Sequence, residues 1–188
     1  MVASLYGRAP RWDVLEAATD GVFIPVTYCG GIRSVDDVRL AMRHGADKVA
    51  MNTAALLRPE LINECAAVFG SQAVVVSIEA KRREDGKYEA FYNAGREPSG
   101  KEVGAWAKEA EERGAGEIVV TSVDRDGTGR GIDIHILGEW WQRLSIPLLA
   151  GGGISGSEDV ALCGGKSFGA VAGAALHSGR NNVSGLRP

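Results

Sequence analysis

The chain has few of the features that mark secreted, membrane-bound or nucleic-acid-binding proteins. Its three cysteines are odd in number and lack metal-ligand spacing, so we expect no disulfide framework, no metal site and a reducing, cytoplasmic location. No apolar run approaches the roughly 20 residues of a membrane span, and the N-terminus lacks a signal-peptide core. The net charge of −3 gives no attraction for a polyanion. We therefore expect neither a membrane nor a nucleic-acid partner.

The residues that are present describe an ordinary globular chain. Of its 188 residues, 45% are hydrophobic and 24% are charged, which suffices for a substantial core. We find no linker or low-complexity segment, so we expect one domain over residues 1–188. That length is short for a complete eight-stranded α/β barrel, which usually needs about 250 residues.

Short apolar runs alternate with stretches of helical periodicity, which favours an α/β fold with a parallel sheet covered by helices. The expected strands are Val22–Tyr28, Lys48–Thr53, Ala73–Ala80, Glu117–Val123, Pro147–Ala150 and Gly169–Ala174. The expected helices are Trp12–Thr19, Val35–His44, Pro59–Phe69, Lys101–Arg113, Ile134–Arg143 and Ser157–Leu162, and residues 178–188 suggest no last helix. Polar and glycine-rich loops follow the strands, so the chemistry is expected at the carboxyl ends of the strands.

An internal repeat divides the chain into two similar halves. Matching residues lie 122 positions apart (147 − 25): Pro25 and Pro147, Gly31 and Gly153, Val38 and Val160, Val49 and Val171. Each half predicts a buried strand, a glycine-rich turn, a helix that starts with acidic residues, and a second strand. Such a turn leaves backbone N–H groups free at a helix N-terminus, which is how a phosphate is held. Two such turns predict a bisphosphorylated small molecule, and the alternative is a structural duplication without a ligand.

Polar residues at the strand ends extend this prediction. Asn52 and Thr53 would add side-chain donors to the first phosphate, although Thr53 could instead cap a helix. Glu79, near the end of an apolar strand and followed by Lys81, Arg82 and Arg83, is a candidate general acid or base. The alternative for this carboxylate is an ion pair at the mouth of a barrel.

Two further loops carry candidate binding residues. The loop Ser122–Gly129 concentrates carboxylates and glycines directly after a strand, which favours a function over a plain turn. Gly152 and Gly153, with Gly173 and Ala174 one strand further on, would form the second phosphate turn. Strand alternation leaves open which side of the sheet Lys48 faces.

The chain resembles the cyclase subunit of imidazole glycerol phosphate synthase. The segments that carry this resemblance are Phe23–Ile32, Arg33–Val38, Gly45–Ala55, Phe69–Gln72 and Gly114–Thr128. The match is dense from about residue 3 to residue 156 and thinner beyond. It implies a (β/α)8 TIM-type barrel built from two half-barrels, with its first two strands apparently missing here, because residues 3–8 look like the loop after an earlier strand.

The resemblance also implies a reaction and a partner. In that family a glutaminase subunit, docked as a heterodimer at the opposite end of the barrel, releases ammonia that travels through the barrel. The cyclase, a lyase of histidine biosynthesis, uses it to convert phosphoribulosyl aminoimidazole carboxamide ribotide into imidazole glycerol phosphate and aminoimidazole carboxamide ribotide. No cofactor is implied.

Site residues follow by position from the same resemblance. It assigns Glu79 to one of two catalytic carboxylates and Lys48 to the gate of the ammonia tunnel. One phosphate region would comprise Gly31, Asn52, Thr53, Asp126 and Gly127, and the other Gly152, Gly153, Gly173 and Ala174. The chain departs from the family in four places: the first-strand carboxylate has no counterpart, Glu79 stands for an aspartate, Cys29 for a glycine, and Ala174 for a hydroxyl residue.

Two alternatives stay open at this point. A paralogue of the cyclase supplies ammonia for the amidation of a sugar in surface-polysaccharide synthesis, and Tyr28 and the short C-terminal end resemble that group. A non-catalytic, truncated phosphate-binding fragment is the other.

Overall fold

The computed structural model describes residues 6, 8–164 and 168–188, and its main sheet is parallel. The strand order is β1-β2-β3-β6-β7-β8, and each neighbouring pair runs parallel. These strands are β1 (Thr27–Cys29), β2 (Lys48–Met51), β3 (Val74–Arg82), β6 (Glu117–Ser122), β7 (Leu148–Gly151) and β8 (Gly169–Val171). The predicted α/β class is confirmed. Most of the expected leading loop, at residues 3–5 and 7, lies outside the described residues.

Helices precede, connect and follow the strands of the main sheet. They are α1 (Trp12–Thr19), α2 (Val35–Arg43), α3 (Thr53–Leu57), α4 (Glu60–Phe69), α5 (Val103–Glu112), α6 (Ser157–Gly164), α7 (Ala174–His177) and α8 (Val183–Leu186), with 3-10 turns η1 (Ser71–Ala73), η2 (Ile134–Leu137) and η3 (Trp140–Arg143). The prediction of one helix over residues 134–143 is wrong, because Gly138 adopts φ +51° and separates η2 from η3. The prediction that the C-terminal segment has no helix is also wrong, since α8 forms there. None of the described helices has the length and apolar character needed to cross a membrane.

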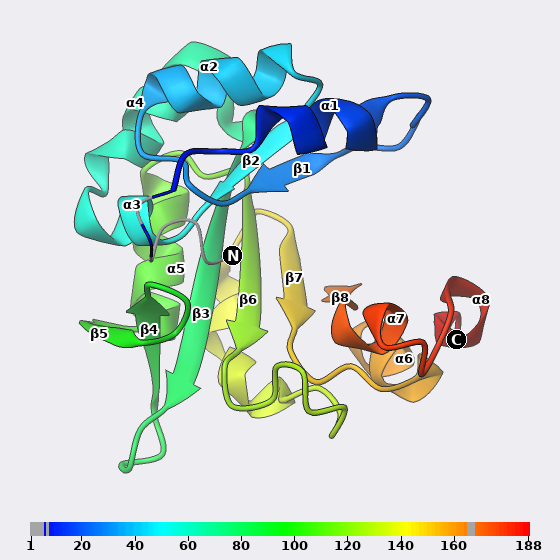
Figure 1. Cartoon of the computed structure of the whole chain (residues 1–188). Helices are drawn as coiled ribbons and strands as arrows, with labels where there is room; N and C mark the ends of the chain where they lie inside the picture. Colours follow the sequence, from blue (N-terminus) through cyan, green and yellow to red (C-terminus); the bar gives the residue numbers. More distant parts are fainter. Residues whose placement is uncertain (1–5, 7, 165–167) are drawn as a thin grey trace.

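A β-hairpin that the sequence patterns did not predict grows from the end of β3 (Figure 1). Strand β3 continues past the expected end at Ala80 as far as Arg82, and β4 (Tyr88–Tyr92) returns antiparallel to it. Strand β5 (Glu97–Glu102) pairs with β4, so Lys101 belongs to a strand and not to the helix expected to begin there. Because β5 is largely exposed and charged, it lacks the apolar alternation by which strands are recognised.

Strand β3 presents a different chemistry on each of its two faces. Val74, Val76 and Ile78 join the hydrophobic core, against which α4 and α5 pack. Ser77 and Glu79 alternate onto the opposite, concave face, where they line cavities. Since successive strand residues point to opposite faces, the same strand anchors the core and presents polar groups to the interior.

The internal repeat is visible in matching hydrogen bonds. Asp37 accepts the backbone N–H of Arg33 at 2.9 Å, and Asp159, 122 positions later, accepts that of Ser155 at 2.8 Å. Each carboxylate thereby closes the turn before its helix.

The two halves then slip by one residue. Cys29 of β1 pairs with Ala50, whereas Gly151 of β7 pairs with Val171, so the offset falls from 122 to 121 between the paired residues. The predicted match of Val49 with Val171 is therefore wrong by one position. The physical reason is that α6 has 8 residues where α2 has 9, while four residues separate helix from strand in both halves.

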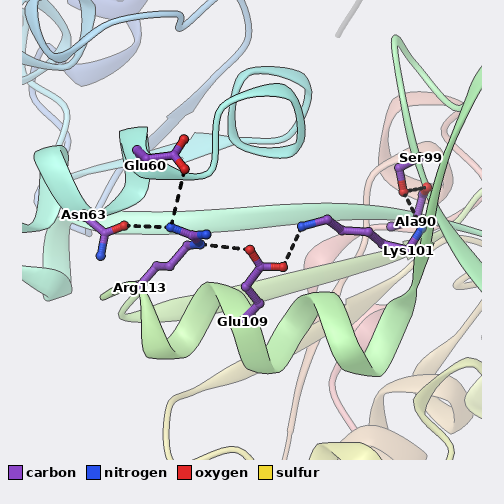
Figure 2. A network of polar contacts seen from close by, with 7 residues as sticks. All are labelled: Glu60, Asn63, Ala90, Ser99, Lys101, Glu109 and Arg113. Carbon is purple, nitrogen blue, oxygen red and sulfur yellow. Dashed lines mark hydrogen bonds and ion pairs between the residues drawn. The ribbon is translucent and has the colours of Figure 1, made fainter.

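A network of polar contacts on α5 holds the hairpin and helix α4 together (Figure 2). Glu109 accepts a hydrogen bond from Lys101 Nζ at 2.5 Å and another from Arg113 Nε at 2.9 Å. Arg113 also donates to Asn63 Oδ1 at 3.2 Å and lies 4.0 Å from Glu60. One carboxylate thus joins strand β5 to a side chain that reaches α4.

We predict that Glu109→Gln destabilises the protein in a pH-dependent way. Burial raises the pKa of Glu109, but the hydrogen bonds from Lys101 and Arg113 outweigh burial and leave the pKa below its usual value. A carboxyl with a lowered folded-state pKa stabilises the fold above its unfolded pKa, and this stabilisation is lost as the pH falls through the folded pKa. Urea denaturation should show a loss of about 1 kcal/mol at neutral pH.

The difference should vanish in strong acid, where both states are protonated. Glu112→Gln, on the same helix and exposed, is the matched control and should leave the unfolding free energy nearly unchanged. A Glu109→Gln effect of equal size at neutral and strongly acidic pH would show that the ion pairs do not cause it.

Candidate functional site

The predicted site residues gather in two adjoining cavities at the concave face of the sheet. The first cavity is lined by Gly31, Asn52, Thr53 and Glu79 together with Ala94 of the hairpin. The second cavity is lined by Gly152, Gly153, Gly173 and Ala174, among others. Cys29, Ala50 and Ser77 line both cavities, so the two are neighbours on one surface.

The first cavity is small. Its volume of about 30 Å³ leaves room for about two water molecules. Four of the predicted residues, Gly31, Asn52, Thr53 and Glu79, do meet there. A phosphate would need more space, and the hairpin turn that carries Ala94 is the part of the wall that the sequence did not predict.

The second cavity is large and also contains Asp126 and Gly127. It has a volume of about 370 Å³, which suits a small-molecule ligand. The predicted grouping of Asp126 and Gly127 with Gly31, Asn52 and Thr53 is wrong in this respect. Strand β6 pairs with β7, so the loop after β6 lies against the glycine turn after β7, and a Cβ on Gly152 would come within 2.6 Å of the Ser122 carbonyl oxygen.

The free backbone N–H groups lie at the helix starts after β2 and β8. The repeat predicted them at the helix starts after the two glycine turns. At the start of α2, Ser34 and Asp37 form a capping box, and the backbone N–H groups of Arg33, Ser34 and Asp37 are already bonded. In contrast, α3 and α7 begin without a side-chain cap, and their first residues, Thr53 and Ala174, line the two cavities. Uncapped N–H groups at these starts are available to an anion.

Glu79 lines the first cavity together with Thr53. Its Oε2 atom accepts the backbone N–H of Gly95 at 2.8 Å. Burial raises the pKa of Glu79, the hydrogen bonds from Gly95 and Asn52 oppose that rise, and the negative charge of Asp126 adds to it. A carboxyl with a raised pKa is suited to proton transfer near neutral pH.

The alternative of an ion pair for Glu79 finds no support in the described residues. None of their ion pairs includes this carboxylate. Lys81, two residues along β3, has its Nζ 5.4 Å from the centre of the Phe91 ring. Glu79 also lies three residues before the end of β3, and not at the very end of the strand as expected.

Asn52 and Thr53 hold the turn between β4 and β5. Asn52 Nδ2 donates to the Phe91 carbonyl at 3.0 Å, and Thr53 Oγ1 accepts the N–H of Asn93 at 3.1 Å. The cap position of α3 is Asn52, so the interpretation of Thr53 as a helix cap is wrong.

Lys48 faces the interior, which the sequence left open. Its Nζ donates to Glu117 Oε2 at 2.5 Å, and the two side chains are 31% and 11% exposed. Both residues open their strands, so the pair lies at the opposite end of the sheet from Glu79. The analysis of the sequence gave Glu117 no role. A charge at the start of an otherwise apolar strand was the signal that could have identified it.

The turn between β4 and β5, which we call the hairpin turn, has an unusual backbone. Asn93, Ala94 and Gly95 adopt φ values of +52°, +60° and +73° in succession. Asparagine and glycine tolerate this region, whereas an alanine there costs about 1–2 kcal/mol. Strain of this kind often accompanies functional sites.

Comparison with known proteins places the chain in a family. A family model described as histidine biosynthesis protein matches residues 1–182. The chain belongs to this family. It is 44% identical over 187 residues to the imidazole glycerol phosphate synthase subunit HisF of Symbiobacterium thermophilum, an alignment that covers 98% of this chain and 74% of the relative.

Two further HisF subunits give similar matches. The one from Legionella pneumophila is 48% identical over 158 residues, covering 84% of this chain and 74% of its own length. The one from Alkaliphilus metalliredigens is 41% identical over 177 residues, covering 93% and 70%. The resemblance found in the sequence is thereby confirmed.

We predict that Ala94→Gly stabilises the fold. Glycine adopts φ +60° without the steric cost that alanine carries, so the unfolding free energy should rise by about 0.5–1 kcal/mol after the entropy loss of glycine is subtracted. The matched control is Ala17→Gly on the exposed face of α1, where the same substitution should cost about 1 kcal/mol. Chemical denaturation measures both, and a loss of stability at both positions would contradict the strain.

Proposed function

We propose that this chain performs the cyclase reaction of imidazole glycerol phosphate synthase. The observation that carries the proposal is the position of Glu79, a partly buried carboxylate that lines the first cavity, beside a second cavity with which that cavity shares Cys29, Ala50 and Ser77. Family membership supports it, and the three relatives named above all bear the name of this synthase. Those names favour histidine synthesis over the amidation of a sugar.

The substrate would span both cavities with a phosphate at each end. Gly31 and Thr53 provide the surroundings of one phosphate, and Gly153, Gly173 and Ala174 those of the other. Because the first cavity is small, the turn that carries Ala94 has to move before a phosphate can bind there. Binding at two linked points favours a bisphosphate over a monophosphate.

Glu79 would transfer the protons of the reaction. The family reaction forms a bond from ammonia nitrogen to the substrate and releases the carboxamide ribotide as a second product. As a general base Glu79 takes a proton from the attacking nitrogen, and as a general acid it returns one to the leaving nitrogen. A raised pKa serves both steps, since the group then exchanges protons near neutral pH.

The Lys48–Glu117 pair would form the gate for ammonia. It lies at the amino ends of β2 and β6, and Glu117 lines the same interior cavity as Asp126 and Gly127. The subunit names of the relatives imply a complex with a partner subunit. We propose that this partner is a glutaminase docked at the Lys48 end in a heterodimer, and that both proteins are cytoplasmic.

We predict that Glu79→Gln abolishes most ammonia-dependent turnover. Proton transfer by a positioned group contributes about 10²–10⁴-fold, and glutamine keeps the shape of the side chain while losing that function. Turnover with saturating ammonium should fall by this factor, while calorimetry should show nearly unchanged ligand binding. Glu84→Gln, at the exposed tip of the hairpin, is the matched control. Unchanged turnover in Glu79→Gln would remove this residue from the mechanism.

We predict that Gly173→Asp weakens the binding of a bisphosphate by at least tenfold. A Cβ at Gly173 meets nothing within 4 Å, so the substitution adds a negative charge to the second cavity without a clash. The neutral Gly173→Asn is the control of similar shape and should lose less affinity. Calorimetry with a bisphosphate and the matching monophosphate measures both effects, and equal affinity of the wild type for the two ligands would argue against two phosphate regions.

A further inference from the structure

We propose that the hairpin turn of Asn93, Ala94 and Gly95 is the positioning element of Glu79. In this proposal the backbone N–H of Gly95 orients the carboxylate toward the cavities and favours its charged form. The proposal rests on the proposed function, because it assumes that Glu79 is the group that transfers protons.

The contact between the turn and Glu79 is specific. The amide nitrogen of Gly95 lies 2.8 Å from Oε2, and Gly95 is buried. Val123, which follows β6, lies directly behind the turn, because a Cβ on Gly95 would come within 2.9 and 3.0 Å of its two methyl groups. With φ at +73° in addition, the position accepts only glycine without movement. Contact with Val123 therefore fixes the position of this N–H.

Three other contacts fix the turn in the same place. Asn93 donates its N–H to Thr53 Oγ1, and the Phe91 carbonyl, just before the turn, accepts Asn52 Nδ2. The N–H of Arg96 closes the turn on the Tyr92 carbonyl at 3.1 Å. A strained backbone keeps one conformation only where its surroundings hold it, and these contacts supply that hold.

Hydrogen-bond donors favour the charged form of Glu79, and the N–H of Gly95 is one of them. Among the described residues, the titratable groups that face this carboxylate are Asp126, from the loop after β6, and the thiol of Cys29 on β1. Neither is a cation, and Lys81 on the same strand has its Nζ near the Phe91 ring. The donors that oppose the effect of burial on the pKa are Gly95 and Asn52. Loss of the Gly95 donor should therefore raise the pKa of Glu79 further.

The test is Gly95→Ala, read out by titration of Glu79 itself. Glutamate labelled with ¹³C at the carboxyl carbon gives an NMR signal for Glu79 that is assigned by its loss in Glu79→Gln. In Gly95→Ala this signal should titrate at a higher pH than in the wild type. The acidic limb of ammonia-dependent turnover should move to higher pH by the same amount, a change that general destabilisation does not produce.

Two variants separate the contact from backbone strain. Gly100→Ala introduces the same strain in the same hairpin, because Gly100 has φ +76°, but nothing lies within 4 Å of its Cβ position and its N–H bonds to Glu89. It should leave the titration of Glu79 unchanged. Val123→Ala, combined with Gly95→Ala, makes room for the new methyl group and should return the titration toward the wild-type value.

A further variant covers the case in which Gly95→Ala does not fold. Val123→Ile adds a methyl group beside Gly95 without substituting any residue of the turn. It should also raise the pH at which Glu79 titrates. An unchanged Glu79 titration in Gly95→Ala and Val123→Ile, or an equal shift in Gly100→Ala, would overturn the inference. If Gly95→Ala shifts the titration as expected but the wild-type protein shows no ammonia-dependent turnover, the positioning of Glu79 is supported and the cyclase function is contradicted.

Discussion

The burial of strand β3 on both of its faces is the constraint on which the rest of the structure depends. On one face Val74, Val76 and Ile78 pack beneath α4 and α5, and full burial of such side chains is worth about 1.5–3 kcal/mol each. A shift of β3 by one residue would move these side chains into the interior and Glu79 into the apolar core. Hydrophobic packing therefore fixes the register of the strand, and the register in turn fixes the carboxylate at the cavities.

The hairpin that grows from β3 is held by a different kind of interaction. Lys101 reaches Glu109 on α5 and also lies 4.3 Å from the centre of the buried Trp106 ring. Partly buried charge pairs and cation–π contacts are modest individually, but they act here on a segment with little apolar surface of its own. They keep the hairpin against α5, and the turn at its end reaches the cavities. The site thus combines a strand fixed by the core with a turn fixed by polar contacts.

The sequence predicted the parallel strands well and the polar parts of the site less well, for physical reasons. Val74–Ile78 is apolar except for Ser77, and a strand with both faces inside the protein produces that pattern directly. Strand β5 contains Pro98 and Gly100 and is exposed, so its existence depends on pairing with β4, which no local pattern reveals. Contacts between residues far apart in the chain, such as Gly95 with Glu79, are invisible to periodicity for the same reason.

The resemblance and the repeat predicted which residues belong to the site but not how they divide. Gly31, Asn52, Thr53 and Glu79 meet as expected, since carboxyl ends of neighbouring parallel strands share one edge. Asp126 and Gly127 joined the other cavity because their strand pairs with β7. The symmetry of the repeat also hid the fact that Asp37 accepts the backbone N–H groups of Arg33 and Ser34 just before α2.

The two halves of the repeat give the two cavities different surroundings. A perfect repeat would offer identical surroundings to both ends of a bisphosphate, and such a ligand could bind in either direction. Here the first cavity presents Thr53, a hydroxyl in a narrow space, and the second presents Ala174, which has no hydroxyl, in a wide one. Under the proposed function, the two cavities would distinguish head from tail in a ligand whose two ends carry the same charge.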